Sequence, residues 1–229
     1  TQAQNGFLFV NNYVREYDMP AYQGFQVEIK LPAGKQLLLP EQPIDLPSGS
    51  YFVWPFNEDL AGLHLRFATA QPLAKLGTAD APVFAFFAQP GIAPEFVIDD
   101  TPGLKLDGTA GVERHDGALW LHNLTPGPAT RVRFTLASGK RVTLLLLTQQ
   151  DAENAWQITS TSATDLLITP QQAYVNGSVA TLEHLGATNF SAQLALADRS
   201  RLAPVDPHVK LVRTGDAYSA TLATSTPTE

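Results

Sequence analysis

Residues 130–148 read TRVRFTLASGKRVTLLLLT, and this stretch decides the fold class of the chain. Arg131–Leu136 and Arg141–Leu147 each have the composition of a short strand. The second contains the undiluted apolar run Leu144–Leu147, which indicates a buried strand. The four residues Ala137–Lys140 join the two strands and include a glycine, so the stretch predicts a β-hairpin.

Strand signals continue on both sides of this hairpin. Phe25, Val27 and Ile29 alternate with polar residues, and this period of two is typical of a half-buried strand. The 17 prolines and 16 glycines punctuate such runs at intervals of roughly 10–15 residues. The sequence therefore predicts an all-β protein built of antiparallel β-sandwich domains. Further strands are predicted at 6–10, 37–39, 51–54, 63–67, 83–87, 95–98 and 119–122, with those at 37–39 and 51–54 ending before Pro40 and Pro55.

One segment departs from the strand pattern. Ala152, Ala155 and Trp156 have the spacing of one helical face, so we expect a short helix near residues 150–156 with Trp156 in the core. A polar run, Thr159–Thr164, follows and predicts a domain boundary. We expect a larger β domain at residues 5–160 and a smaller β-sandwich at 161–229 that ends in a tail.

Composition excludes several functional classes. The chain carries 15 basic and 22 acidic residues, and the basic ones are scattered, which argues against nucleic-acid binding. No apolar run reaches the ~20 residues that a membrane span needs. The absence of cysteine rules out disulfides and thiolate metal sites. The five histidines lack metal-ligand spacing, so we expect no metal site.

The sequence offers no catalytic residue that we can name. His64 and His122 fall on the polar phase of their strands, which indicates a solvated face. Glu58-Asp59 and Asp99-Asp100 are the adjacent acidic pairs, and both have the context of turns rather than of a paired catalytic site. No nucleophile motif is present.

Aromatic residues provide the candidate binding site. Tyr51, Trp54, Phe56 and Asn57 lie in or just after one predicted strand and could contact a sugar or a docked domain. In the strand 51–54 both phases are aromatic or apolar, which predicts burial against a neighbouring domain.

The order of several segments resembles glycoside hydrolase family 35, in the region that follows the catalytic (β/α)8 barrel of bacterial β-galactosidases. The similarity covers most of residues 6–200. It rests on GFLFVNN (6–12), QVEIKLP (26–32), SYFVWPFN (50–57), LRFATAQP (65–72), FAFFA (84–88), PEFVI (94–98) and VTLLLLT (142–148) with DAENAW (151–156).

The resemblance implies a non-catalytic accessory region of a retaining β-galactosidase. Its partner is then the catalytic barrel of the same polypeptide, its candidate ligands are galactosides, and it needs no cofactor. The family's two catalytic glutamates lie on barrel strands, and no position here corresponds to them. A periplasmic or secreted location is expected.

Two alternatives stay open at this point. The chain could instead be a free-standing carbohydrate-binding or adhesion module. Its one methionine is at position 19 rather than at position 1, so the chain could be an excised fragment. A complete gene product is the other alternative.

Overall fold

The computed structural model describes residues 5–107, 111–183, 189–196, 202–204 and 209–221. It is 61% strand and 4% helical, which confirms the all-β prediction. The chain divides into two compact units, residues 1–75 with 80–149 and residues 76–79 with 150–229.

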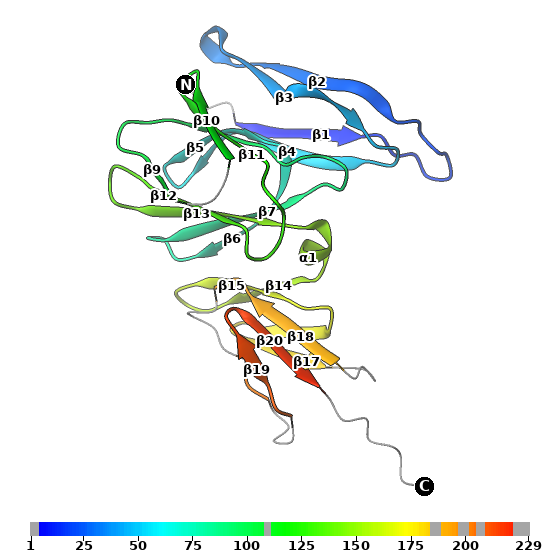
Figure 1. Ribbon diagram of the computed structural model, residues 1–229, viewed down its shortest axis with the longest axis vertical. Helices are drawn as coiled ribbons and strands as arrows, with labels where there is room; N and C mark the ends of the chain where they lie inside the picture. The colour runs from blue at the N-terminus through cyan, green and yellow to red at the C-terminus, as the bar shows by residue number, and fades with distance from the viewer. Residues whose placement is uncertain (1–4, 108–110, 184–188, 197–201, 205–208, 222–229) are drawn as a thin grey trace. The chain divides into compact units, whose positions relative to one another are not determined.

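Two sheets and a long hairpin form the first unit (Figure 1). The strands of each sheet are given below in spatial order, so that neighbours in the order are hydrogen-bonded to each other. The first sheet has the order β1 (Gly6–Asn11), β4 (Tyr51–Leu60), β5 (Leu63–Ala68), β8 (Phe96–Asp99), β11 (Ala118–His122) and β10 (Gly111–His115). The second has the order β6 (Ala70–Gly77), β7 (Pro82–Ala88), β13 (Arg141–Leu147), β12 (Arg131–Thr135) and β9 (Lys105–Asp107). The hairpin consists of β2 (Tyr22–Lys30), a single 3-10 turn at Pro32–Gly34, and β3 (Gln36–Leu46).

Both faces of the first sheet carry buried residues. On one face, Leu65 and Phe96 pack with Phe134 and Leu144 of the second sheet. On the other face, residues such as Trp54 pack under the β2–β3 hairpin, which lies over β1 and β4 in Figure 1. The first unit is therefore a sandwich with a third, two-stranded layer, and β5 and β8 are the central strands of its first sheet.

The hairpin predicted from residues 130–148 is present. β12 and β13 pair antiparallel from Arg131↔Leu145 to Thr135↔Arg141. The turn closes with a 2.9 Å hydrogen bond from the Leu136 N–H to the Lys140 carbonyl, and Gly139 supplies a φ of 83°. On its other side, β13 pairs parallel with β7, so the sheets are not purely antiparallel.

Two strands run through prolines at which the sequence predicted an end. β3 continues through Pro40. Because β3 pairs only with β2, the N–H groups on its other edge have no strand to bond, and a proline can stand there without the loss of a hydrogen bond between strands. β4 continues through Pro55. The backbone N–H groups of residues two apart point to the same edge of a strand. On this edge the Val53 N–H donates to the Gln71 side chain rather than to a neighbouring strand. Pro55, which has no N–H, therefore removes no hydrogen bond between strands.

The helix is shorter than predicted. α1 spans Gln149–Glu153, and Trp156 lies in the next strand with 39% of its surface exposed. The prediction that Trp156 belongs to the core is therefore wrong. Residues 155–159 form β14 (Ala155–Thr159), which pairs along its whole length with β15 (Thr164–Ile168), and this pairing overrides the helical spacing.

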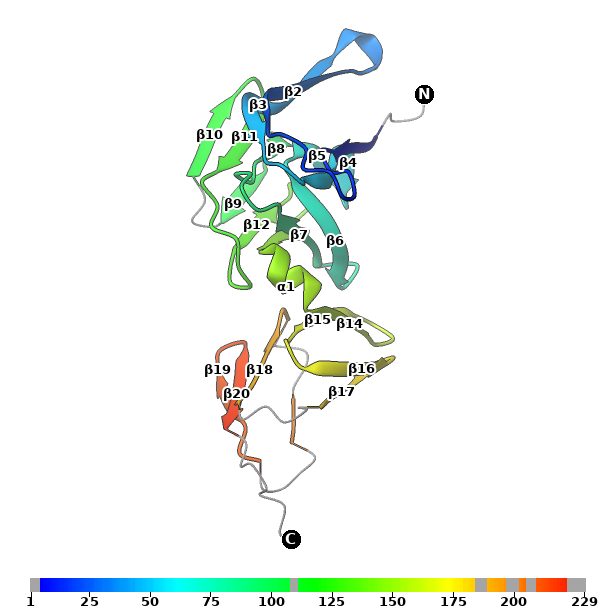
Figure 2. The same cartoon turned by 90° about the vertical axis from the view of Figure 1, so that its right-hand side faces the viewer.

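The second unit is smaller and has its own core. One set of strands has the order β14, β15, β18 (Asn189–Leu194), β20 (Ala217–Thr221) and β19 (Val212–Thr214), and a hairpin is formed by β16 (Gln172–Asn176) and β17 (Val179–Glu183) (Figure 2). Leu167, Leu194 and Tyr218 are buried, with Ala180 and Leu182 of β17 packed against them. The boundary between the units lies at Gln149–Gln150, about ten residues before the predicted one, because β14 pairs with β15.

Candidate functional site

The four residues predicted to bind do not share one face. Along β4, side chains alternate, so Tyr51 and Val53 point to one side while Phe52 and Trp54 point to the other. Trp54 is 0% exposed and stacks on Phe52 with ring centroids 4.2 Å apart. Trp54 is therefore a core residue and is removed from any surface contact.

Tyr51, by contrast, lies on an exposed apolar surface. β1 pairs with β4 in the register Phe9↔Val53 and Asn11↔Tyr51, and directly opposite residues point to the same side of a sheet. Phe9 is 76% exposed and Tyr51 63%. We name the surface formed by Phe7, Phe9, Tyr13, Tyr51 and Val53 the β1–β4 face.

A groove extends this face. It has a volume of about 270 Å³ and is lined by Phe7 together with Pro55, Leu73 and Phe84. Lys75 lies over the Phe84 ring, with Nζ 5.7 Å from the centroid. Exposed side chains and an adjoining apolar groove have the character of a protein interaction surface.

Phe56 and Asn57 have different surroundings. Phe56 is half-buried against the core beneath β2–β3, and its ring lies beside Gly6, where a Cβ would be 2.9 Å from Phe56 Cζ. Asn57 has a φ of 55° and points toward β5. Its Oδ1 lies 2.9 Å from Nε2 of His64.

Asn57 belongs to a cluster of polar side chains from three neighbouring strands, which we name the Asp99 cluster (Asn57, His64, Arg66 and Asp99). Nε of Arg66 donates to Oδ1 of Asp99 over 2.6 Å. Oδ2 of Asp99 lies 2.7 Å from Nδ1 of His64, a close contact that does not have the geometry of a hydrogen bond. The carboxylate of Asp99 thus lies between the side chains of Arg66 and His64 and contacts both.

Irregular backbone places the Asp99 cluster. The pairing of β5 with β8 shifts by one residue between Leu65 and Phe67, so Arg66 sits at a bulge. From there, Nη2 of Arg66 donates to the carbonyl oxygens of Asp116 and Gly117 at 3.0 and 2.9 Å. Arg66 therefore binds both the end of β8 and the β10–β11 turn.

A pocket of about 290 Å³ opens at the Asp99 cluster. Lys35 and Gln36 of the β2–β3 hairpin line it, as does Asp116, and Leu31 and Leu37 add apolar surface. The charged side chains are two cations and two anions besides His64, so the pocket is close to neutral. Its donors and acceptors suit a polar, uncharged ligand.

The Asp99 cluster corrects two interpretations of the sequence. His64 was expected on a solvated face, yet it is half-buried, with Asn57 Oδ1 2.9 Å from Nε2 and Asp99 Oδ2 2.7 Å from Nδ1. Asp99 was expected in a turn, yet it ends β8 and accepts from Arg66. Alternation along one strand could not reveal either role, because Asp99 lies more than thirty residues from His64 and Arg66 in sequence.

The other acidic and histidine candidates remain separate. Glu58 and Asp59 lie within β4 rather than in a turn, and Asp59 Oδ1 accepts the Gly62 N–H over 2.7 Å. His122 pairs with Glu113 at 3.2 Å. His184 and His208 fall outside the described residues. Within the described ranges, no three His, Asp or Glu side chains are grouped closely enough to hold a metal ion.

One carboxyl group has a shifted pKa. Burial raises the pKa of Glu95 from 4.5 to about 7, and the nearby charge of Glu41 adds to the rise. The Glu41 N–H donates to Oε2 of Glu95 over 3.3 Å, which opposes it. Glu41 also faces Nε2 of His115 at 3.6 Å, and the His115 ring stacks on Trp120.

No protein family matches this sequence, and no curated protein matches it closely enough to count as a relative. In the part of the chain that the structure describes, no helix is both long and apolar enough to cross a membrane. The surface geometry and the ordered sequence segments therefore carry the functional interpretation.

Proposed function

We propose that this chain is the accessory, non-catalytic β region of a retaining β-galactosidase, and that its β1–β4 face docks against the catalytic barrel of the same polypeptide. The observation that carries the proposal is the exposure of Phe9 and Tyr51 on adjacent strands. Large aromatic side chains that lie side by side in water are costly unless a partner covers them.

The sequence of the face supports the same partner. GFLFVNN (6–12) and SYFVWPFN (50–57), two of the segments that resemble family 35, form β1 and β4. Each segment alternates between core residues, such as Trp54, and face residues, such as Tyr51. The resemblance thus includes residues that the fold of this chain does not itself bury.

Amide hydrogen exchange tests the docking proposal directly. The isolated chain and the full-length parent enzyme are compared under identical conditions. We expect slower exchange at β1 and in Tyr51–Trp54 in the parent, because the barrel covers them, while β16 and β17 serve as an internal reference. Equal exchange at β1 in both proteins rules out docking through this face.

A second candidate function, carbohydrate binding by a free-standing module, is favoured by the pocket at the Asp99 cluster. Its fixed donors and acceptors, with Leu31 and Leu37 beside them, match the polar and apolar faces of a pyranose. The β1–β4 face suits a sugar less well, because the Tyr13 and Tyr51 rings are inclined by 56° and form no flat platform. A galactose titration followed by NMR distinguishes the two functions. Chemical-shift changes confined to Asn57, His64 and Lys35 support carbohydrate binding. If no such changes occur, docking is the one function that still stands.

A further inference from the structure

The second unit contains a buried carboxylate with half of its hydrogen-bonding capacity unused. Asp165, on β15, is only 4% exposed. Its Oδ1 accepts the N–H groups of Leu166 and Leu196 at 2.7 and 2.8 Å, which ties β15 to the end of β18. Its Oδ2 is buried, and no donor among the described residues reaches it. A buried acceptor without a donor is rare and costly, so its presence calls for a partner.

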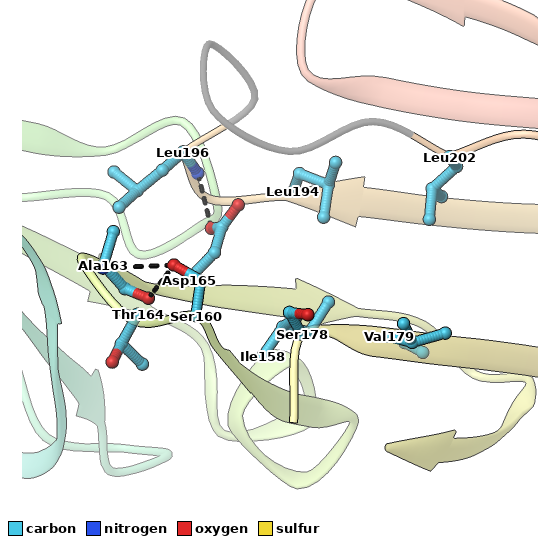
Figure 3. Close-up of a pocket in the computed structure, with 11 residues that line it drawn as sticks. Ile158, Ser160, Ala163, Thr164, Asp165, Ser178, Val179, Leu194, Leu196 and Leu202 are labelled. Carbon is cyan, nitrogen blue, oxygen red and sulfur yellow. Dashed lines mark hydrogen bonds between the residues drawn. The ribbon is translucent and has the colours of Figure 1, made fainter. Parts of the chain in front are cut away.

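This carboxylate forms part of the wall of a cavity of about 390 Å³ at one end of the second unit's core (Figure 3). In Figure 3, Asp165 projects from its strand toward the strand of Leu194, while Ile158, Ser178 and Val179 lie on the opposite side. Ala180, Leu194 and Leu202 supply apolar lining. The size is within the range of small-molecule sites.

The charge of the side chains that line the cavity indicates which class of ligand it can bind. Among the described residues that line the cavity, Asp165 is the one ionisable side chain, and the others are aliphatic or hydroxyl-bearing. A desolvated carboxylate attracts a cation more strongly than it does a neutral donor. The chain's net charge of −7 favours the approach of a cation as well.

We propose that this cavity binds a small organic cation, with an ammonium group donating to Oδ2 of Asp165 and a short aliphatic body packed between Ala180 and Leu194. The hydroxyl of Ser178 lies at the rim and can accept a second N–H. This site belongs to the second unit and does not depend on docking of the β1–β4 face.

A titration of the full chain with n-butylammonium, monitored by amide NMR, tests the proposal, with n-butanol and butyrate as matched ligands. We expect shifts at Leu166, Ala180 and Leu196, and binding of n-butylammonium at least tenfold tighter than that of n-butanol. Asp165→Asn keeps Oδ1 for the two backbone donors and is expected to abolish the tenfold preference. Ala180→Leu fills the apolar end without touching the carboxylate and is expected to abolish binding of both ligands.

Equal affinities for n-butylammonium and n-butanol overturn the proposal, as does an ammonium preference that survives in Asp165→Asn. Shifts that appear only outside the cavity overturn it too. If Asp165→Asn does not fold, Ala180→Leu and the comparison of the three ligands on the wild-type chain still decide.

Discussion

The backbone N–H of Glu41, on β3, donates to the carboxyl group of Glu95, the residue before β8, over 3.3 Å. This bond joins the β2–β3 hairpin to the sheet beneath it. Because burial raises the pKa of Glu95 to about 7, the folded state favours the protonated carboxyl. The stability gained from protonation is fully present below pH 4.5 and is lost as the pH rises through about 7.

Glu95→Gln should therefore remove part of the pH dependence of stability. Glutamine keeps an acceptor for the Glu41 N–H but has no charge to desolvate. Between pH 5 and pH 8, we expect the wild type to lose on the order of 2 kcal/mol relative to the variant. Urea unfolding of both proteins at the two pH values measures this. A constant difference between them contradicts the assignment.

Arg66 should be a far more important cation than Arg114. Arg66 bonds Asp99 and two carbonyl oxygens of the β10–β11 turn, and a lysine cannot reproduce that fork. We expect Arg66→Lys to destabilise the chain by about 1–3 kcal/mol. Arg114, in an exposed ion pair with Asp100, is the matched control, and Arg114→Lys should cost less than about 0.5 kcal/mol. Similar losses from both substitutions, in urea unfolding, would count against the Asp99 cluster as an organising element.

The two tryptophans of β4 and β14 should differ sharply. Trp54 is fully buried, so Trp54→Ala should cost about 3–5 kcal/mol. Trp156 is partly exposed at the surface of the second unit, so Trp156→Ala should stay within about 1 kcal/mol of wild type. Chemical unfolding measures both free energies, and a loss at Trp156 as large as that at Trp54 would show that Trp156 belongs to the core after all.

The isolated chain should not hydrolyse nitrophenyl β-galactoside. Retaining glycosidases need two carboxyl groups about 5–5.5 Å apart around one bond. Glu58 and Asp59 are adjacent on β4, so their side chains point to opposite sides. The full-length β-galactosidase that the proposed function implies, at equal concentration, is the positive control, and a Glu58→Gln/Asp59→Asn chain tests for contamination. Turnover that disappears in this double variant contradicts the non-catalytic assignment.

Local patterns in the sequence predicted the strands well. The hairpin at residues 130–148 followed from two strand-like runs and one glycine, and each run interacts first with its neighbour in sequence. Long-range pairing was beyond such patterns. The parallel pairing of β13 with β7 joins segments about sixty residues apart in sequence. The residue pattern of neither segment indicates which other strand it pairs with.

The candidate site was predicted only in part for the same reason. Tyr51 and Trp54 look equivalent in sequence, but the β2–β3 hairpin covers the side on which Trp54 lies and leaves Tyr51 exposed. The buried role of Asp165 had no local signal, because its donors include Leu196, thirty-one residues away.

The most direct test of the docking proposal is the affinity of the isolated chain for the separately produced catalytic barrel, measured by isothermal titration calorimetry. We expect Phe9→Ser/Tyr51→Ser to weaken binding at least tenfold, because both side chains leave the β1–β4 face. Tyr174→Ser, which removes an exposed aromatic residue from β16, should change the affinity less than twofold. Equal affinities of the wild-type chain and the Phe9→Ser/Tyr51→Ser chain, or no binding of the wild-type chain, would contradict docking through this face.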